Sequence, residues 1–268
     1  MFTPHMRLRD ALASFFFTAA LAVTLTTSGA SAATLQVTSF GAGDYAGAQA
    51  ALAAFRSGTD GWGGANKQVN AVRTENFENM KAWDGSSGDA NPTTAVGAFT
   101  SLGGRGSGAS SIAGGAALQV RSDDPWVWGR HNASGVDGKW LDSNDTLGMR
   151  WDVGGLTQFN SVAFLLTDVA DVGGKFSIKV GDTLFSNLLG ASGRLANGSI
   201  QLVHILLPAS VSGLRVELFN DRLNDGFGID GATVASVAPV PLPPAILLLA
   251  SGGAALFGVS RRRRRAAA

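Results

Sequence analysis

Aromatic and polar side chains alternate in one short stretch of the chain, WVWGRHN, which covers residues 126–132. The indole rings of Trp126 and Trp128 are suited to stacking on the apolar faces of sugars, and Arg130 and Asn132 are suited to hydrogen bonding with sugar hydroxyls. The stretch therefore predicts a glycan-binding platform. The alternative is that these tryptophans pack within or at the edge of a β-sheet core, with each indole N–H bound to a backbone acceptor.

Two further segments concentrate carboxylates and amides at spacings of two or three residues, one at residues 137–145 and one at residues 220–225. Such spacings are typical of calcium-binding loops. Neither segment, however, matches the twelve-position loop of an EF-hand with its terminal glutamate. We therefore expect both to be solvated turns.

Side chains suited to catalysis are few. After residue 32 the sequence contains two histidines, His131 and His204, and the whole chain has no cysteine. His204 lies in the apolar stretch 202–207, where a core or edge histidine is expected. There is no G-x-S-x-G or H-E-x-x-H motif. The sequence predicts a protein that is not an enzyme, and a glycosidase built on two carboxylates is the least favoured alternative.

The body of the chain alternates apolar and polar residues, as in Lys175–Val180, where Phe176, Ile178 and Val180 fall on one face. Short strands separated by glycine-rich turns predict an all-β fold, an antiparallel two-sheet sandwich of jelly-roll type. The predicted strands cover residues 35–40, 116–121, 147–153, 161–167, 175–180, 199–207, 213–220 and 228–235.

One short helix near the start of this body is also expected. Asp44 is suited to capping the N-terminus of the alanine-rich stretch 45–56, and Gly58 is suited to closing its C-terminus. No alternation of strands and helices follows, so the helix decorates a sheet. The stretch 85–115 is rich in Gly, Ser and Ala and predicts long loops.

Charge excludes one class of partner. Without the two end segments described below, the body keeps 14 of the 21 basic and 19 of the 20 acidic side chains, a formal charge of −5. A mildly acidic body has no basic patch for nucleic acid, so no nucleic acid partner is expected. Because there is no cysteine, neither disulfides nor thiolate metal sites are available.

The first 32 residues have the pattern of a secretory signal peptide. Arg7 and Arg9 precede an apolar run, and small residues follow at Ala30 and Ala32. A basic region, an apolar region and an A-x-A site predict export with cleavage after Ala32. An uncleaved membrane anchor is the alternative.

The last 30 residues combine three features in a fixed order. A proline-rich stretch, Val240-Pro241-Leu242-Pro243-Pro244-Ala245, overlaps the uncharged stretch 242–260, and the arginine block follows at Arg261, Arg262, Arg263, Arg264 and Arg265. As a helix, residues 242–260 reach about 28 Å, enough to span a bilayer as a transmembrane helix. The arginine block keeps the end of the chain in the cytoplasm, so the body lies outside.

This order resembles the PEP-CTERM class of bacterial sorting signals, and VPLPPA at residues 240–245 is similar to its VPLPA variety. The resemblance implies processing by an exosortase, a membrane transpeptidase that recognises the proline motif in bacteria that make extracellular polysaccharide. A run of closely spaced prolines cannot form a regular helix, so it presents an extended backbone to such an enzyme. A plain single-pass membrane anchor is the alternative.

The body is also similar to the extracellular β-sandwiches that often carry this tail. The similarity lies in Phe77-Glu78 and in the stretch GFGIDG at residues 226–231. In such jelly rolls the first and last strands are neighbours, so the resemblance implies that Glu78 and Asp230 are ligands of a structural Ca²⁺ ion. Ca²⁺ takes six to eight oxygen ligands and tolerates irregular geometry. The alternative is that Asp230 caps a turn and Glu78 is exposed.

These expectations define three regions: a signal peptide at 1–32, a β-sandwich at 33–238 and a sorting signal at 239–268. The expected protein is exported, held briefly in the inner membrane by its tail and then placed at the cell surface or outside the cell. We expect a non-enzymatic envelope or extracellular matrix protein, with extracellular polysaccharide as a candidate partner. A calcium-stabilised carbohydrate-binding module is the alternative.

Overall fold

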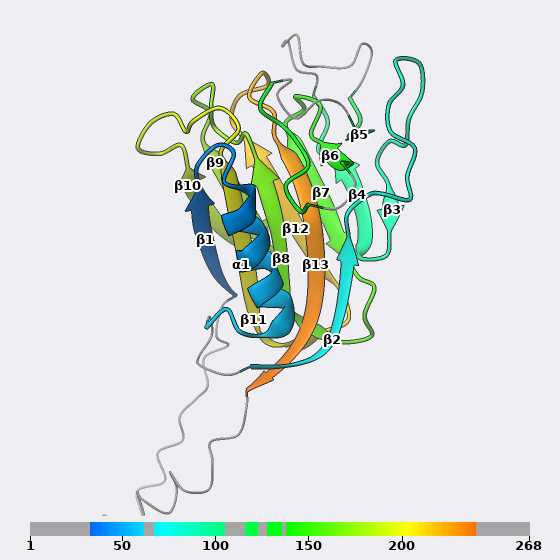
Figure 1. Ribbon diagram of the computed structural model, residues 1–268, viewed down its shortest axis with the longest axis vertical. Helices are drawn as coiled ribbons and strands as arrows, with labels where there is room; N and C mark the ends of the chain where they lie inside the picture. The colour runs from blue at the N-terminus through cyan, green and yellow to red at the C-terminus, as the bar shows by residue number, and fades with distance from the viewer. Residues whose placement is uncertain (1–32, 62–66, 105–115, 123–127, 136–137, 240–268) are drawn as a thin grey trace, which may run out of the picture. The chain divides into compact units, whose positions relative to one another are not determined.

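The computed structural model describes residues 33–61, 67–104, 116–122, 128–135 and 138–239 (Figure 1). Within these ranges the chain is mostly antiparallel β-structure in two sheets with one short helix, which confirms the expected fold class at that level. The expected signal peptide and sorting signal lie outside the described residues. Among the residues that are described, no helix is both long enough and apolar enough to cross a membrane.

The first sheet comprises seven of the described strands: β1 (Thr34–Phe40), β11 (Ile200–Val211), β8 (Phe159–Thr167), β13 (Gly228–Pro239), β6 (Trp140–Asp142), β5 (Gln119–Arg121) and β2 (Lys67–Glu75). Their order is β1-β11-β8-β13-β6-β5. Strand β2 also pairs with β13, along residues 232–239, whereas β6 pairs with residues 228–229 of the same strand. An early strand and the last strand are therefore neighbours.

The second sheet comprises six of the described strands: β10 (Thr183–Leu189), β9 (Phe176–Val180), β12 (Leu214–Asn220), β7 (Gly148–Val153), β4 (Gly97–Ser101) and β3 (Thr93–Thr94), in that order. Strands β9 and β7 alternate buried and half-buried residues over most of their length, because one face of this sheet meets the core. The chain crosses from the first sheet to the second several times, the last time between β11 and β12.

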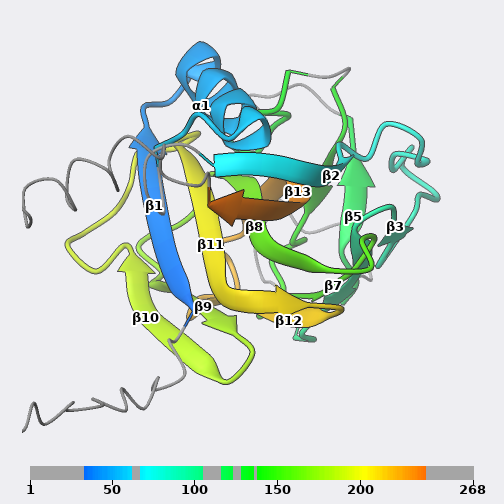
Figure 2. The same cartoon turned by 90° about the horizontal axis from the view of Figure 1, so that it is seen from below.

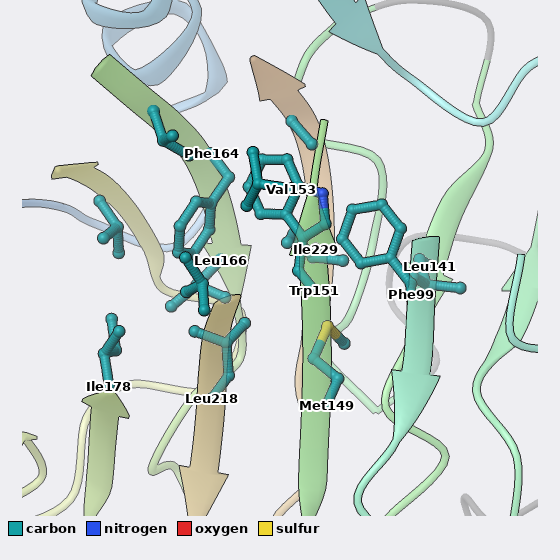
Figure 3. Packing of buried hydrophobic residues seen from close by; sticks show 14 of the residues in the cluster. Phe99, Leu141, Met149, Trp151, Val153, Phe164, Leu166, Ile178, Leu218 and Ile229 are labelled. Carbon is teal, nitrogen blue, oxygen red and sulfur yellow. The ribbon is translucent and has the colours of Figure 1, made fainter. Parts of the chain in front are cut away.

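Apolar side chains from the two sheets meet in a common core (Figure 3). Trp151 of β7 contacts Phe164 of β8 edge to face, with ring centroids 5.9 Å apart, and stacks on Phe99 of β4 at 5.1 Å. The indole N–H of Trp151 donates to the carbonyl oxygen of Val96 at 2.9 Å, so this buried polar atom is satisfied.

Helix α1 (Tyr45–Ser57) covers the outer face of the first sheet (Figure 2). Its ends confirm the prediction: the side chain of Asp44 accepts a hydrogen bond from the N–H of Gly47, and Gly58 ends the helix with a left-handed φ of 75°. Leu52 packs with Leu165 of β8 in a second apolar cluster between helix and sheet.

Strand β8 is buried on both faces because of this arrangement. Phe164 and Leu166 point into the core between the sheets, whereas Ala163 and Leu165 lie beneath α1. The strand is therefore a nearly continuous apolar run instead of an alternating one.

Several elements differ from the sequence prediction. The strands at residues 67–75, 93–94, 97–101, 140–142 and 183–189 were not expected. The loop predicted over 85–115 is wrong where β3 and β4 form, because Phe99 enters the core from a segment of small residues. Residues 105–115 of that predicted loop lie outside the described residues. Each of the eight predicted strands is confirmed, with ends shifted by a few residues.

Candidate functional site

Polar residues gather where β6 and β8 end. Gly228 of β13 pairs with Asp142 on one side and with Thr167 on the other. Asp142 is the last residue of β6, and Asp168 directly follows the last residue of β8. Antiparallel pairing to a single strand therefore brings two aspartates that are far apart in the sequence to the same end of the sheet.

The turn after β6 adds a third carboxylate, that of Asp145, to this end. Asn144 and Asp145 adopt left-handed φ values of 52° and 53°, which asparagine and aspartate tolerate better than other non-glycine residues. Oδ1 of Asp142 accepts a hydrogen bond from the N–H of Asn144 at 2.9 Å. Both Asp142 and Asp145 are buried, so the expectation of a solvated turn is wrong here.

Arg130 explains that burial. Its guanidinium donates from Nη1 to Oδ1 of Asp142 at 2.9 Å and from Nη2 to Oδ1 of Asp145 at 2.5 Å, and Nε lies 3.9 Å from Oδ2 of Asp168. Burial by itself would lower the pKa of Arg130, but the charges of Asp142 and Asp145 raise it overall. Only 3% of Arg130 is exposed, so its guanidinium pairs with buried carboxylates and is not available at the surface to bind a glycan.

Negative charge is in excess around this arginine. Burial raises the pKa of Asp168 to about 8, although Oδ1 of Asp168 accepts a hydrogen bond from the N–H of Gly198 at 2.9 Å. Burial, with the charge of Asp225, also raises the pKa of Asp171. Asp168 and Asp171 therefore hold their protons more tightly than exposed aspartates do.

The second predicted turn is also partly buried. Asn220 and Asp225 are buried, and Nδ2 of Asn220 donates to the carbonyl oxygen of Asp225 at 2.5 Å. Oδ2 of Asp225 accepts from the N–H of Gly174 at 2.5 Å. Asp221 and Asn224 are exposed as expected. Asp137, at the start of the other polar segment, lies outside the described residues.

Trp128 is the member of the predicted glycan platform that reaches solvent, with 49% of its surface exposed. It has a left-handed φ of 64°, and Gly129 follows with a φ of 77°. A β-carbon at Gly129 would overlap the side-chain oxygens of Asn197 and Asp168, so only glycine fits at this close approach. Trp126 lies outside the described residues.

Asn132 has a structural task within the same segment. Its Nδ2 donates to the carbonyl oxygen of Lys139 and its Oδ1 accepts from the N–H of Gly135, both at 3.1 Å. The amide therefore holds its own chain. Arg130 and Asn132 both face protein partners, so Trp128 alone represents the predicted platform at the described surface.

Glu78 and Asp230 both bind backbone N–H groups of one segment, residues 133–139. Oδ2 of Asp230 accepts from Ala133 at 3.0 Å and from Ser134 at 2.8 Å, and Oε1 of Glu78 accepts from Lys139 at 2.9 Å. Burial raises the pKa of Asp230 to about 7, against the opposing effect of these backbone donors. The two carboxylates anchor the two ends of this segment.

This arrangement does not fit a calcium ion between Glu78 and Asp230. Asp230 is fully buried and its other oxygen, Oδ1, accepts from the N–H of Gly231 at 2.6 Å. The ammonium group of Lys139 donates to the carbonyl oxygen of Glu78 at 2.7 Å and thus places positive charge beside the expected ligand. Within the described ranges, no group of three or more His, Cys, Asp or Glu side chains is arranged to hold a metal ion.

A second polar site lies beside helix α1. A cavity of about 280 Å³ opens between α1, strand β1 and the residues that follow the helix. Its wall combines small apolar side chains with hydrogen-bonding groups: Gln36, Thr38, Ala51, Ala54, Thr59, Asp60, Leu202 and His204.

A chain of polar contacts leads inward from this cavity. Nζ of Lys67 lies 3.1 Å from Oδ1 of Asp60, and Oδ2 of Asp60 lies 3.2 Å from Nδ1 of His204. Nε2 of His204 lies 2.9 Å from Oγ of Ser161. Burial, and then the charge of Lys67, lower the pKa of His204 to about 2, so the imidazole is neutral. Its single proton belongs on Nδ1, which faces the carboxylate, and Nε2 accepts from the Ser161 hydroxyl.

The order Asp, His, Ser is that of a hydrolase triad, but access differs. Ser161 is fully buried and does not line the cavity, whereas His204 and Asp60 do. The serine therefore orients the imidazole from within the sheet. A substrate carbonyl has no route to its hydroxyl in this geometry.

Sequence reasoning identified only the histidine of this chain of contacts and expected it at a core or edge position, and His204 is buried on β11. Ser161 lies on β8 and Asp60 follows the helix, so their meeting with His204 depends on the pairing of β8 with β11 and on helix packing. A histidine within an apolar stretch was the available signal in the sequence.

Comparison with known proteins adds little to this picture. No family model matches the chain, and no curated protein matches it. Among solved structures, one similar chain is the Stig cyclase Fisc from Fischerella sp. TAU in complex with (3Z)-3-(1-methyl-2-pyrrolidinylidene)-3H-indole. It is 11% identical, the match covers 65% of this chain and 92% of that chain, and the TM-score is 0.24.

Proposed function

We propose that this chain is an exported, non-enzymatic protein of the cell envelope or extracellular matrix, whose body is a jelly-roll-like sandwich sorted through a PEP-CTERM-like tail. In the precursor, a signal helix precedes the body and a transmembrane helix follows it. The tail holds the protein briefly in the inner membrane until an exosortase-type enzyme acts on the proline motif. The processed body then resides at the cell surface or outside the cell.

The observation that carries this proposal is the order of three features at the end of the sequence. A proline motif at 240–245 overlaps the start of an uncharged stretch at 242–260, and five arginines follow directly at 261–265. A helix with this charge pattern spans the bilayer with its arginines in the cytoplasm, so the proline motif lies at the outer face, where the folded body is.

The non-enzymatic part of the proposal rests on how the polar groups of the body are used. The carboxylates of Asp142 and Asp145 bind Arg130, and the hydroxyl of Ser161 is buried against His204. The two aspartates and the serine hydroxyl bind buried side chains and do not line the cavity beside α1, which supports a structural role for them.

Intact mass spectrometry of the protein recovered from its host tests both ends at once. The expected mass lacks residues 1–32 and the tail beyond the proline motif. Replacing Arg261–Arg265 with alanine removes the topological signal and is expected to leave unprocessed protein, whereas replacement with lysine keeps the charge and is the matched control. A mass that retains residues 242–268 in the unaltered protein would mean a plain membrane anchor.

A further inference from the structure

Two cavities lined by described residues can be compared, and the one beside α1 is the better built. The other, of about 450 Å³, is lined by loop residues 79–80 and 89–93. There the amide oxygen of Asn91 accepts from the N–H groups of Ser101 and Leu118, and Asp89 accepts from the N–H of Lys81, so the side chains support the loop itself. The cavity beside α1 instead presents its polar groups from three different elements.

Its wall has two kinds of surface. Ala51 and Ala54 of α1 and Leu202 of β11 form an apolar part, and the exposed side chains of Gln36, Thr38 and Thr59 lie with Asp60 and His204 in the polar part. A ligand that fits both must itself have an apolar face and a rim of hydrogen-bonding groups.

The charges in this wall compensate one another. The carboxylate of Asp60 is paired with the ammonium group of Lys67 at 3.1 Å, and its neighbour His204 is neutral. A charged ligand would therefore lose its hydration without gaining a countercharge in this wall. This favours a neutral ligand.

Asp60 is held in place before any ligand arrives. Lys67 donates to Oδ1 at 3.1 Å and to Oδ2 at 3.4 Å, and Nδ1 of His204 lies 3.2 Å from Oδ2. The hydroxyl of Ser161 fixes the ring of His204 from the far side. Oδ1 has a second lone pair beside its hydrogen bond from Lys67, so this oxygen remains able to accept a hydroxyl. An acceptor that is already oriented loses little conformational entropy on binding.

We propose that this cavity binds a neutral, hydroxyl-rich ligand of about the size of one sugar ring, with its apolar face on Ala51, Ala54 and Leu202 and its hydroxyls on Asp60 and the neighbouring polar side chains. The volume of about 280 Å³ lies near the lower limit of small-molecule sites, which matches a monosaccharide unit. The choice of a saccharide rests on the proposed function, since an exported matrix protein meets polysaccharide. Ser161 acts as a positioning residue for His204.

The test uses the full chain purified in detergent and a set of neutral methyl glycosides, with glucuronate and glucosamine as charged comparisons. Ligand-observed saturation-transfer NMR is expected to detect binding of at least one neutral glycoside. The expected Kd is about 1 mM. Stronger binding of a charged comparison, or no binding of any neutral glycoside, would overturn the proposal.

Two helix variants locate the binding. Ala54→Leu fills the cavity and is expected to weaken glycoside binding by at least about tenfold, equivalent to 1.4 kcal/mol. Ala53→Leu, on the exposed face of the same helix, is the matched control and keeps binding, because leucine suits both helical positions. Equal binding by both variants would place the ligand elsewhere, for example at Trp128, and would overturn the assignment to this cavity.

A third measurement separates binding from catalysis and from sorting. A fluorophosphonate probe is expected to leave Ser161 unmodified, and labelling of its hydroxyl would overturn the positioning role. The intact mass of the host-derived protein is read independently of these titrations. A processed mass without glycoside binding would overturn this inference and leave the proposed function standing. An unprocessed mass with glycoside binding would overturn the proposed function and leave the binding site standing.

Discussion

Oδ1 of Asp142 accepts a hydrogen bond from Nη1 of Arg130 at 2.9 Å, and both side chains are buried. The pair joins the segment after Trp128 to the end of β6, and the same guanidinium reaches Asp145 in the following turn. Arg130, which the sequence analysis predicted to bind sugar hydroxyls, thus connects separate parts of the chain. Removing the guanidinium of Arg130 should therefore destabilise this end of the sheet.

We expect Arg130→Met to lower the free energy of unfolding by about 3–5 kcal/mol, because it removes the guanidinium that pairs with the buried carboxylates of Asp142 and Asp145. Asp142 keeps Arg121 at 3.6 Å in this variant. Chemical denaturation followed by tryptophan fluorescence measures this change. Arg150→Met is the matched control: Arg150 pairs with Asp152 at 3.1 Å, but their side chains are 37% and 42% exposed. That exposed pair is expected to contribute less than about 1 kcal/mol. Similar losses in the two variants would show that the buried cluster has no special role.

Asp168 should make stability depend on pH. Its folded pKa of about 8 exceeds the unfolded value of about 3.9, so between these values the folded state retains a proton that the unfolded state releases. The stabilisation is complete at low pH and is lost as pH rises through about 8, with a slope of at most about 1.4 kcal/mol per pH unit from this group.

Asp168→Asn keeps an oxygen for the N–H of Gly198 but does not titrate, so its free energy of unfolding should fall less steeply between about pH 5 and 8. Urea denaturation at several pH values measures the slopes. Asp221→Asn is the control, because the exposed carboxylate of Asp221 also accepts a backbone N–H, that of Lys175. An unchanged slope in Asp168→Asn would contradict the raised pKa.

Gly226 tests how closely the chain approaches the cluster. A β-carbon at this position would overlap Oδ1 of Asp145 and the guanidinium carbon of Arg130. Because those atoms are themselves held by ion pairs, we expect Gly226→Ala to lower the free energy of unfolding by about 1–3 kcal/mol. A β-carbon at Gly41 meets nothing within 4 Å, so Gly41→Ala is the control and should leave the melting temperature nearly unchanged. If Gly226→Ala and Gly41→Ala had equal effects, the side chains of Arg130 and Asp145 would be able to move aside at no cost in stability.

Asp230 should stabilise the protein without calcium. Asp230→Ala leaves the N–H groups of Ala133 and Ser134 without their acceptor, which should cost about 2–4 kcal/mol even in EDTA. Differential scanning fluorimetry with excess Ca²⁺ and with EDTA measures how the substitution and the ion each change the melting temperature. Glu78→Ala, which alters the other expected calcium ligand, is measured in the same way. We expect the same melting temperature in the two solutions. A rise with Ca²⁺ that disappears in Asp230→Ala would restore the calcium site implied by the family resemblance.

The sequence by itself determined the features that depend on neighbours along the chain. Asp44 and Gly58 end the helix through local hydrogen bonds and backbone conformation, and alternation in Lys175–Val180 places Phe176 and Ile178 on one face. Export and sorting are likewise predicted from contiguous motifs at the two ends, because a signal of this kind is read as a linear segment.

Only the tertiary structure decided which polar groups meet. Asp142 and Asp168 come together because β6 and β8 flank the same strand, and Ser161, His204 and Asp60 come together because α1 lies over the pair of β8 and β11. The physical reason is that burial of a charge depends on its partners in space, and neither the pairing of distant strands nor the packing of a helix on a sheet is encoded in residue spacing.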